Sequence, residues 1–355
     1  MTTINSKSNI CTVQNETEKS TKYEHLVISG GGVYGFCLYT AIRDSNLRGE
    51  WNIENIKSMY AVSAGTIIST IIALRHDWSV IDEYIINRPL HTLFKWGNLS
   101  LTSVFYNCGM FDRTIFIDFL RPFFAGANLG EEDIDIEITM RSFYEKTGIS
   151  LHFYCTGMTE IKTFEKVEMS AEKTPDLPVI DAIYRSCTIP FIICPQRDIL
   201  IDRTNSTEIS KFCGAAPREG GVKLQQNGEQ KNGGRNNIYI DGYLKTNYPS
   251  LDCINSGANE ENILGFRLKP NYSDINNMID FVKSIIFAIG NSSIYPLKHE
   301  YIVDYHFFDT FDKIYLFFKS VERRRYIING GGDGDGGGGG GDGGGDGGDG
   351  GGAKI

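Results

Sequence analysis

The order of apolar and polar positions predicts short buried strands that alternate with helices in the first part of the chain. An apolar run at residues 23–29 (YEHLVIS) ends on three glycines, and the residues after them have helical spacing up to Asn46. A second apolar run at 56–62 (IKSMYAV) leads directly into a helical pattern at 64–75 (AGTIISTIIALR). This alternation is typical of a mainly parallel sheet that helices cover, so we expect an α/β fold.

The alternation resumes beyond an aromatic-rich stretch at residues 93–124, whose pattern assigns no element. We expect a strand at 151–156, a helix at 178–187 that begins near a proline, and a short strand at 238–240. From 276 to 328 the apolar spacing is mostly helical. The aromatic rings of 93–124 are expected mainly in the core, the alternative being an apolar rim that enters a lipid surface.

Polar and low-complexity segments divide the chain. Residues 1–22 are polar, and we expect them to be disordered. The main domain is expected at 23–255, with a long polar surface insertion at 202–237. A mostly helical extension at 256–329 is expected to pack on it, and the tail at 330–355 is expected to be disordered. The tail holds 18 of the 40 glycines, so glycine content is ordinary elsewhere.

Charge and cysteine spacing exclude several classes of protein. The chain of 355 residues has a formal net charge of −9, which gives no electrostatic footprint for nucleic acid. Its first 20 residues lack the apolar core of a signal peptide, and no apolar window is long enough for a membrane span. The eight cysteines form no C-x-x-C pair, so we expect reduced thiols and no metal site. We therefore expect a cytoplasmic protein, with membrane association at most peripheral.

Ser63 is the first candidate for chemistry. It follows the apolar run at 56–62 within Ala-Val-Ser-Ala-Gly, where a strand should turn sharply into a helix. Small neighbours permit such a turn, and a serine there exposes its Oγ beside a helix N-terminus, as in a nucleophile elbow. Ala61 replaces the first glycine of the usual G-x-S-x-G pattern. The alternative is a serine that caps an ordinary helix with its side chain.

A second candidate is the glycine-rich run GGGVYG at residues 30–35, between a strand and a helix. Glycines there allow backbone N–H groups to converge on a phosphate or on the oxyanion of an acyl-transfer transition state. A dinucleotide site would need an acidic residue at the end of the next strand, but Glu50 lies in a loop and that strand ends on Ser63. A plain tight turn is the remaining alternative.

Asp241 is the third candidate, because it ends the short strand at 238–240 and precedes Gly242. An aspartate at that position can lie beside the elbow serine and accept its proton, the alternative being a common Asp-Gly turn. A serine triad would instead need a histidine late in the chain. None of the six histidines has a recognisable catalytic setting: 25, 76, 91, 152, 299 and 306.

Together these segments resemble the patatin-like phospholipase family. GGGVYG at 30–35 is similar to the family's oxyanion loop, AVSAG at 61–65 to its nucleophile elbow, and DGYLKTNYP at 241–249 to its D-G-x-x-x-x-N-x-P segment. Residues 174–195 resemble the family's helix and the following turn through Ser186, Pro190 and Pro195. The four motifs occur in the family's order, which makes the match specific.

The resemblance implies a three-layer α/β/α domain and a Ser-Asp dyad in place of a triad. It implies hydrolysis of acyl esters in phospholipids or other glycerolipids through an acyl-enzyme intermediate, without a cofactor and with transient contact at a membrane or lipid surface. The residues carried over are the nucleophile Ser63, the proton acceptor Asp241, the oxyanion-hole glycines Gly30, Gly31 and Gly32, and the supporting glycines Gly35, Gly65 and Gly242.

The sequence departs from the family pattern at three positions beside these motifs. Tyr34 replaces a basic residue of the oxyanion loop, Ala61 replaces a glycine of the elbow, and Tyr243 replaces a small residue after Asp-Gly. We expect Tyr243 to crowd the mouth of the site. The departures leave one alternative, a weak or inactive module of the same fold that binds lipid or protein. A separate hypothesis is a nucleotide-binding protein that uses residues 30–35 to hold phosphate.

Overall fold

The computed structural model describes most of the predicted domain. The described residues are 22–94, 106–127, 129, 134–158, 163–197, 237–269, 288–291, 294–303 and 316–329. The predictions of disorder in the N-terminal segment and in the tail lie outside these ranges, except for Lys22, as does nearly all of the insertion at 202–237.

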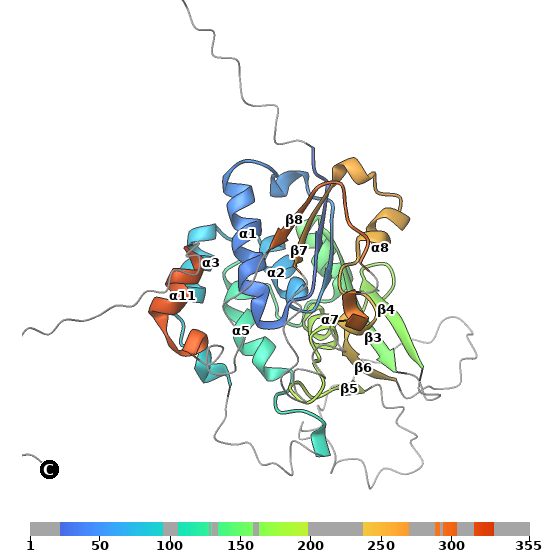
Figure 1. Cartoon of the computed structure of the whole chain (residues 1–355). Helices are drawn as coiled ribbons and strands as arrows, with labels where there is room; N and C mark the ends of the chain where they lie inside the picture. Colours follow the sequence, from blue (N-terminus) through green and yellow to red (C-terminus); the bar gives the residue numbers. More distant parts are fainter. Residues whose placement is uncertain are drawn as a thin grey trace, which may run out of the picture.

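In the described part of the chain, eight strands form one sheet in the order β5-β6-β3-β2-β1-β7-β8, and β4 also pairs with β3 (Figure 1). The pairs among β1, β2, β3, β7 and β8 are parallel, and β4, β5 and β6 join in antiparallel fashion. The mainly parallel central sheet is therefore confirmed. The strands are β1 (His25–Ile28), β2 (Ser58–Val62), β3 (Ser150–Met158), β4 (Phe164–Ser170), β5 (Gln196–Arg197), β6 (Ile238–Asp241), β7 (Ile263–Leu268) and β8 (Glu300–Val303).

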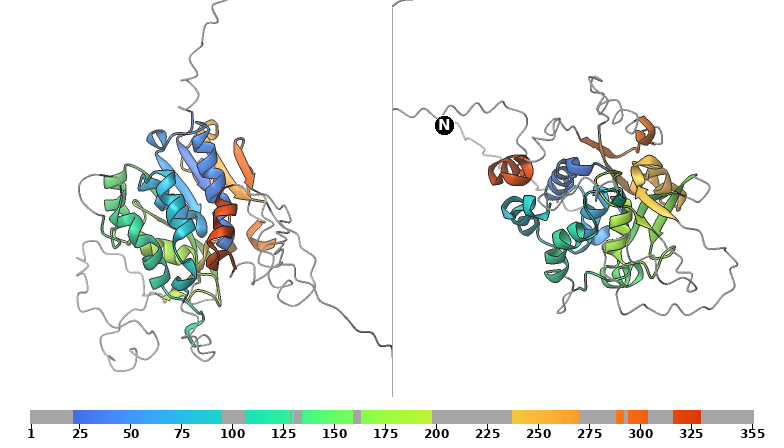
Figure 2. Two further views of the ribbon diagram at one scale, coloured as in Figure 1. Left: turned by 90° about the vertical axis from the view of Figure 1, so that its left-hand side faces the viewer. Right: turned by 90° about the horizontal axis from the view of Figure 1, so that it is seen from below.

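Helices cover both faces of this sheet, so the three-layer arrangement is confirmed as well. Figure 2 shows most of them gathered on one face, and α8 lies on the other. The α-helices are α1 (Gly35–Leu47), α2 (Ala64–Ala73), α3 (Trp78–Asn87), α5 (Thr114–Ala125), α6 (Met140–Thr147), α7 (Val179–Ser186), α8 (Ser250–Asn255) and α11 (Val321–Ile328). Single 3-10 turns occur at Gly32–Tyr34, Ile53–Asn55, Leu90–Leu93, Gly242–Leu244 and Glu260–Asn262.

Alternate residues of the central strands pack into two separate hydrophobic cores. In β1, Leu26 and Ile28 pack into the large core beneath α1 and α2, whereas Val27 faces the smaller core beneath α8. Tyr60 and Val62 of β2 join Val27 in the smaller core. Successive side chains of a strand point to opposite faces, so a strand covered on both sides is apolar almost throughout. This explains the near-continuous apolar runs in the sequence.

The C-terminal part of the chain contributes strands that the helical spacing did not suggest. We expected a mostly helical extension at 256–329, but β7 lies between β1 and β8 inside the sheet. Residues 263–266 of β7 are buried, as expected for an apolar run covered on both faces. The segment at 321–328 is helical, as its spacing predicts. β1 and β7 are far apart in the sequence, so local periodicity could not reveal that they pair.

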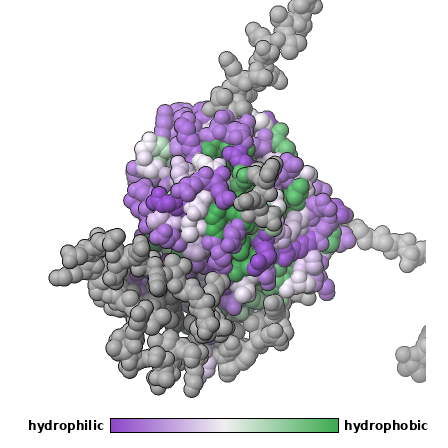
Figure 3. Space-filling model, turned by 180° about the vertical axis from the view of Figure 1, so that it is seen from behind, coloured by the Kyte–Doolittle hydropathy of each residue, from purple (hydrophilic) through white to green (hydrophobic). Residues whose placement is uncertain are grey.

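The aromatic stretch lies largely in the core where the structure describes it. Phe116, Phe123 and Phe124 of α5 are buried, as is Phe111 before it, whereas Tyr106 is exposed. Residues 95–105 lie outside the described ranges. The surface seen from behind is mostly hydrophilic, with an apolar strip across its centre (Figure 3).

Candidate active site

Ser63 occupies a strained turn between β2 and α2. Its backbone has φ 51° and ψ −126°, a left-handed conformation that is uncommon outside glycine. Ser63 is the residue before α2, yet its side chain makes no capping hydrogen bond with that helix. A side chain at Gly65 would come within 2.8 Å of the carbonyl oxygens of Ile28 and Ser29, so α2 packs directly on the end of β1. The turn therefore presents the serine side chain instead of using it as a cap.

The Ser63 hydroxyl donates a hydrogen bond to Asp241 Oδ2 over 2.7 Å. Both residues are buried, with exposed fractions of 3% and 5%. A short O–H···O bond to an ionised acceptor is among the stronger hydrogen bonds in proteins. The structure thus brings together the two residues that the sequence suggested as nucleophile and proton acceptor.

The register of β3 explains why these two residues meet. Val62, the last residue of β2, pairs with Tyr154, and Asp241, the last residue of β6, pairs with Cys155. Because β4 occupies the other edge of β3 along this stretch, β2 and β6 share one edge and meet end to end. Ser63 follows Val62 and therefore lies beside Asp241. Sheet register, and not proximity in the sequence, builds the pair.

Asp241 lies in surroundings that favour its neutral form. Burial raises its pKa from the ordinary value to about 6, although hydrogen bonds from the Tyr243 N–H and the Ser63 hydroxyl lower it. The Tyr243 N–H donates to Oδ1 over 2.8 Å, which fixes the orientation of the carboxylate. A methyl group at Gly242 would overlap the carbonyl oxygen of Tyr154. Only glycine fits this close approach, so Gly242 keeps Asp241 against β3.

Ser186 holds the backbone of Ser63. At the end of α7, its hydroxyl accepts a hydrogen bond from the Ser63 N–H over 2.8 Å and donates to the Tyr154 carbonyl over 2.6 Å. Ser186 is fully buried. The sequence motif at 174–195 included this serine, but only the structure assigns it a positioning role. Its two bonds tie α7, β3 and the strained turn together.

The glycine-rich loop has two backbone N–H groups without an acceptor in the described part of the chain. The Gly30 N–H donates to the Asn247 carbonyl over 3.0 Å, so that donor is occupied. No described residue accepts a hydrogen bond from the N–H of Gly31 or Gly32. Gly32 has φ +51°, and a side chain at Gly31 would approach Leu268 within 2.7 Å. We expected three oxyanion donors at residues 30–32, and the structure leaves the last two available.

The loop and the elbow pack on each other without intervening side chains. A methyl group at Gly35, the first residue of α1, would lie 2.8 Å from the Ala64 side chain. One at Gly30 would meet the Ser63 side chain at 3.3 Å and the Asn247 amide at 2.9 Å. Close packing of this kind requires glycine at both positions. The glycine-rich loop is therefore held against Ser63.

The three departures from the family pattern are accommodated around the site. The Ala61 side chain is fully buried in the large core, and Tyr34 packs against the cluster of Phe317 and Ile327. A side chain at Gly290 would overlap the ring of Tyr243, which therefore lies directly against that glycine. Tyr243 is not among the residues that line the cavity beside Ser63. Our expectation that it crowds the mouth of the site is not supported on the cavity side.

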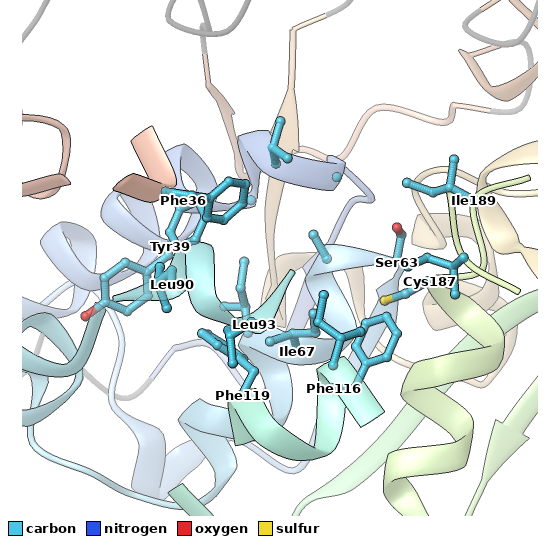
Figure 4. A pocket seen from close by; sticks show the side chains of 18 of the residues that line it. Phe36, Tyr39, Ser63, Ile67, Leu90, Leu93, Phe116, Phe119, Cys187 and Ile189 are labelled. Atoms are coloured by element: carbon cyan, nitrogen blue, oxygen red, sulfur yellow. The ribbon is translucent and has the colours of Figure 1, made fainter. Parts of the chain in front are cut away.

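An apolar cavity of about 220 Å³ opens beside Ser63. Figure 4 shows Ser63, Cys187 and Ile189 at one side of this cavity and Tyr39 and Leu90 at the other. Its walls are almost entirely aliphatic and aromatic and include Phe36, Ile67, Ile68, Ile71, Leu93, Phe116, Phe119, Ile192 and Phe318. Such a lining suits a hydrocarbon chain and gives no partner to a charged ligand. Sequence reasoning did not predict this cavity, although Leu93, Phe116 and Phe119 belong to the stretch at 93–124 for which a lipid-contacting rim was the alternative.

The described histidines lie apart from this site, whereas the buried thiol of Cys187 lies beside Ser63 in the cavity wall. The described histidines, at 25, 76, 91, 152 and 299, make no hydrogen bond with Ser63 or Asp241. In the described ranges, no group of three or more His, Cys, Asp or Glu residues could hold a metal ion. Among the described helices, none combines the length and apolar character needed to cross a bilayer.

Comparison with known proteins places the chain in a family. The family model described as Patatin-like phospholipase matches residues 26–254. An uncharacterised protein of Acanthamoeba polyphaga mimivirus is 24% identical over 296 residues, which cover 79% of this chain and 82% of that protein. The matched range contains both Ser63 and Asp241, whereas β7, β8 and α11 lie beyond it.

The chain is also similar to two solved structures from bacteria. VipD from Legionella pneumophila has a TM-score of 0.45 and 13% sequence identity, over 87% of this chain and 67% of the VipD chain. Full-length ExoU in complex with SpcU, from Pseudomonas aeruginosa, has a TM-score of 0.35 and 14% identity, over 88% of this chain and 53% of that chain. The chain thus spans about half of the length of ExoU.

Proposed function

The chain belongs to the patatin-like phospholipase family, a family of lipid hydrolases, and we propose that it cleaves carboxylic esters of glycerolipids through Ser63 and Asp241. The observation that carries the proposal is the 2.7 Å hydrogen bond from the Ser63 hydroxyl to Asp241, beside an apolar cavity. A serine is a weak nucleophile until a base accepts its proton, and Asp241 is within reach to do so.

In the proposed first step, Ser63 Oγ attacks the ester carbonyl carbon while Asp241 accepts the hydroxyl proton. The tetrahedral intermediate then collapses, and Asp241 returns the proton to the departing alcohol oxygen. This leaves the acyl group esterified to Ser63. A water molecule next gives a proton to Asp241 and attacks the acyl carbonyl. The bond from the acyl carbon to Ser63 Oγ then breaks, Asp241 returns the proton to Oγ, and the fatty acid is released. The same carboxylate acts as base and acid in both halves of the reaction.

Stabilisation of the oxyanion is assigned to the N–H groups of Gly31 and Gly32. They have no acceptor in the described part of the chain, and Gly32 lines the cavity together with Ser63. Removal of one such donor typically raises the barrier by about 3 kcal/mol. Because these donors belong to the backbone, their position depends on the glycine conformations and not on side-chain identity.

The cavity supports a lipid as the substrate. With walls of aliphatic and aromatic side chains, it offers burial to a fatty acyl chain while the ester lies at Ser63. Each methylene removed from water contributes about 0.8 kcal/mol, so a chain of several carbons gains substantial binding energy. Phospholipids, acylglycerols and other glycerolipids share this acyl ester, and a lipid panel separates them.

The test is hydrolysis of such a panel by the wild type, Ser63→Ala and a matched control. Ser69→Ala is the control because Ser69 is a buried serine of α2 that donates to the Gly65 carbonyl and does not line the cavity. Free fatty acids are measured by mass spectrometry. We expect release by the wild type and by Ser69→Ala, and none by Ser63→Ala. Equal release by Ser63→Ala, or none by folded wild type on every lipid, would overturn the proposal.

A further inference from the structure

The loop at residues 188–195, between α7 and β5, has side chains in the cavity wall and others at the surface. Ile189, Ile192 and Ile193 line the cavity that contains Ser63. Phe191 does not line it, and its exposed fraction is 77%. Ile192 is 40% exposed, so this residue spans from the cavity wall to the surface. The loop thus joins the apolar cavity to an apolar surface.

The loop backbone holds Phe191 in an outward position. Its φ is 70°, a left-handed conformation that is a rare outlier for a bulky aromatic residue. On one side the Ile193 N–H donates to the Ile189 carbonyl over 2.9 Å. On the other, the N–H groups of Met110 and Phe111 both donate to the Ile192 carbonyl over 2.9 Å. Strain that the surroundings maintain in this way often marks a functional residue.

The amino-acid composition of the loop favours an uncharged, apolar partner. Its sequence, TIPFIICP, contains no ionisable group other than a cysteine, and the whole chain has a net charge of −9. Attraction to anionic headgroups is therefore not the source of binding. Tyr106, which is 67% exposed, lies a few residues before the segment that is hydrogen bonded to the loop. An aromatic side chain at such a place suits a lipid–water interface.

We propose that Phe191 is a membrane-docking residue, which enters the surface of a zwitterionic or neutral lipid assembly and brings the cavity mouth against it. Ile192 and Ile189 then provide a continuous apolar path from that surface to Ser63. The proposal rests on the proposed function, because it takes the substrate to be a lipid in an assembly. It differs from the expectation for residues 93–124, whose described aromatic side chains are mainly in the core.

Binding to vesicles tests this proposal separately from hydrolysis. Ser63→Ala protein is mixed with phosphatidylcholine vesicles, and the bound fraction is measured by flotation at low and high salt. Into this background we introduce Phe191→Asn, since asparagine tolerates a left-handed backbone and removes only the ring. Leu47→Asn is the matched control, because Leu47 is 66% exposed at the far end of α1 and does not line the cavity.

We expect Phe191→Asn to lower the vesicle partition coefficient about tenfold, the loss anticipated for one aromatic side chain withdrawn from lipid. Leu47→Asn should bind like its parent, and binding should persist at high salt. Equal binding by Phe191→Asn and its parent would overturn the docking proposal, as would binding that disappears at high salt. Neither result depends on turnover, so loss of the docking proposal leaves the hydrolase proposal to its own test.

Discussion

The candidate site around Ser63 and Asp241 and the C-terminal segment at 316–329 contribute to the same cavity. They differ in how completely their buried polar groups are hydrogen bonded. The first contains a strained serine backbone, a buried carboxylate with a raised pKa and two backbone donors without described acceptors. In the second, the buried guanidinium of Arg324 has hydrogen-bond acceptors for its N–H groups. The candidate site therefore holds strained and incompletely hydrogen-bonded groups, whereas the C-terminal segment has an acceptor for each nitrogen of its buried guanidinium.

Arg324 explains how the supporting segment is held. It is fully buried, and its guanidinium donates to four backbone carbonyls: those of Ile86, Arg88, Phe317 and Phe318. The first two lie at the C-terminal end of α3, where carbonyl groups lack helical partners and favour a cation. Arg43 of α1 adds a bond to the Ile328 carbonyl over 2.6 Å. This places Phe318 in the cavity wall.

Asp241→Asn should produce the largest change in activity. The amide cannot accept the serine proton, so turnover of a soluble ester should fall by about 10³-fold. The pKa of Asp241 is higher in the folded protein than in the unfolded chain, so protonation of Asp241 stabilises the folded state. This contribution to stability is fully present below pH 4 and is lost as the pH rises through about 6. At pH 8 the variant should therefore be more stable than the wild type, by up to about 3 kcal/mol.

Turnover and urea unfolding measure the two effects of Asp241→Asn. The control is Asp44→Asn, which removes a carboxylate paired with Arg43 on α1. It should retain the activity of the wild type. If Asp241→Asn kept more than a tenth of wild-type turnover, the role of Asp241 as the base would be untenable.

Arg324→Met should have the largest effect on the supporting segment. Four buried carbonyls lose their donor, so the free energy of unfolding should fall by about 3 kcal/mol. Arg323→Met is the control, because Arg323 is exposed on the same helix and should change stability by less than about 0.5 kcal/mol. Chemical denaturation measures both. Equal stability of the two variants would contradict the support that we assign to Arg324.

The pH dependence of kcat/KM should be a smaller effect. Asp241 must be ionised to accept a proton, so kcat/KM should rise with pH and level off above an apparent pKa of about 6. Below that value it should fall about tenfold per pH unit. Initial rates on a soluble ester from pH 5 to 8 give the profile. A flat profile between pH 5 and 7 would speak against a buried carboxylate base.

Phe318→Ala should give the smallest change, in substrate preference. Loss of the ring widens the cavity, so kcat/KM for long or branched acyl esters should increase relative to short esters, by about threefold to tenfold. Leu316→Ala is the control, since Leu316 is 40% exposed and does not line the cavity. A series of p-nitrophenyl esters measures the ratio. An unchanged ratio would remove Phe318 from the determinants of specificity.

The sequence predicted the residues of the candidate site far better than the contacts of the C-terminal segment at 316–329. Ser63 and Asp241 occur at the ends of short apolar strands, where local pattern and glycine position carry the signal. The family resemblance implied that the two residues form a pair, but neither it nor local periodicity predicted the register of β3 on which their contact depends. The bond from the Gly30 N–H to the Asn247 carbonyl had no local signal, so three donors were expected where two are available.

The residues of the cavity wall show more clearly what the local sequence pattern cannot predict. Phe36, Phe116 and Phe318 come from distant parts of the chain and form one lining only after α1, α5 and the C-terminal segment have packed. In the sequence each is an ordinary apolar residue. The same holds for Arg324, since the run of three arginines gave no indication that only the middle one is buried. Packing over long chain separations decides such roles.

The central claim, that Ser63 is the nucleophile, is tested most directly by mapping the covalent adduct of a fluorophosphonate. The reagent phosphonylates an activated serine, and peptide mass spectrometry identifies the modified residue. We predict one adduct on the wild type, at Ser63, that is absent from Ser63→Ala and strongly reduced in Asp241→Asn. An adduct at another serine, or none on folded wild-type protein, would contradict the claim.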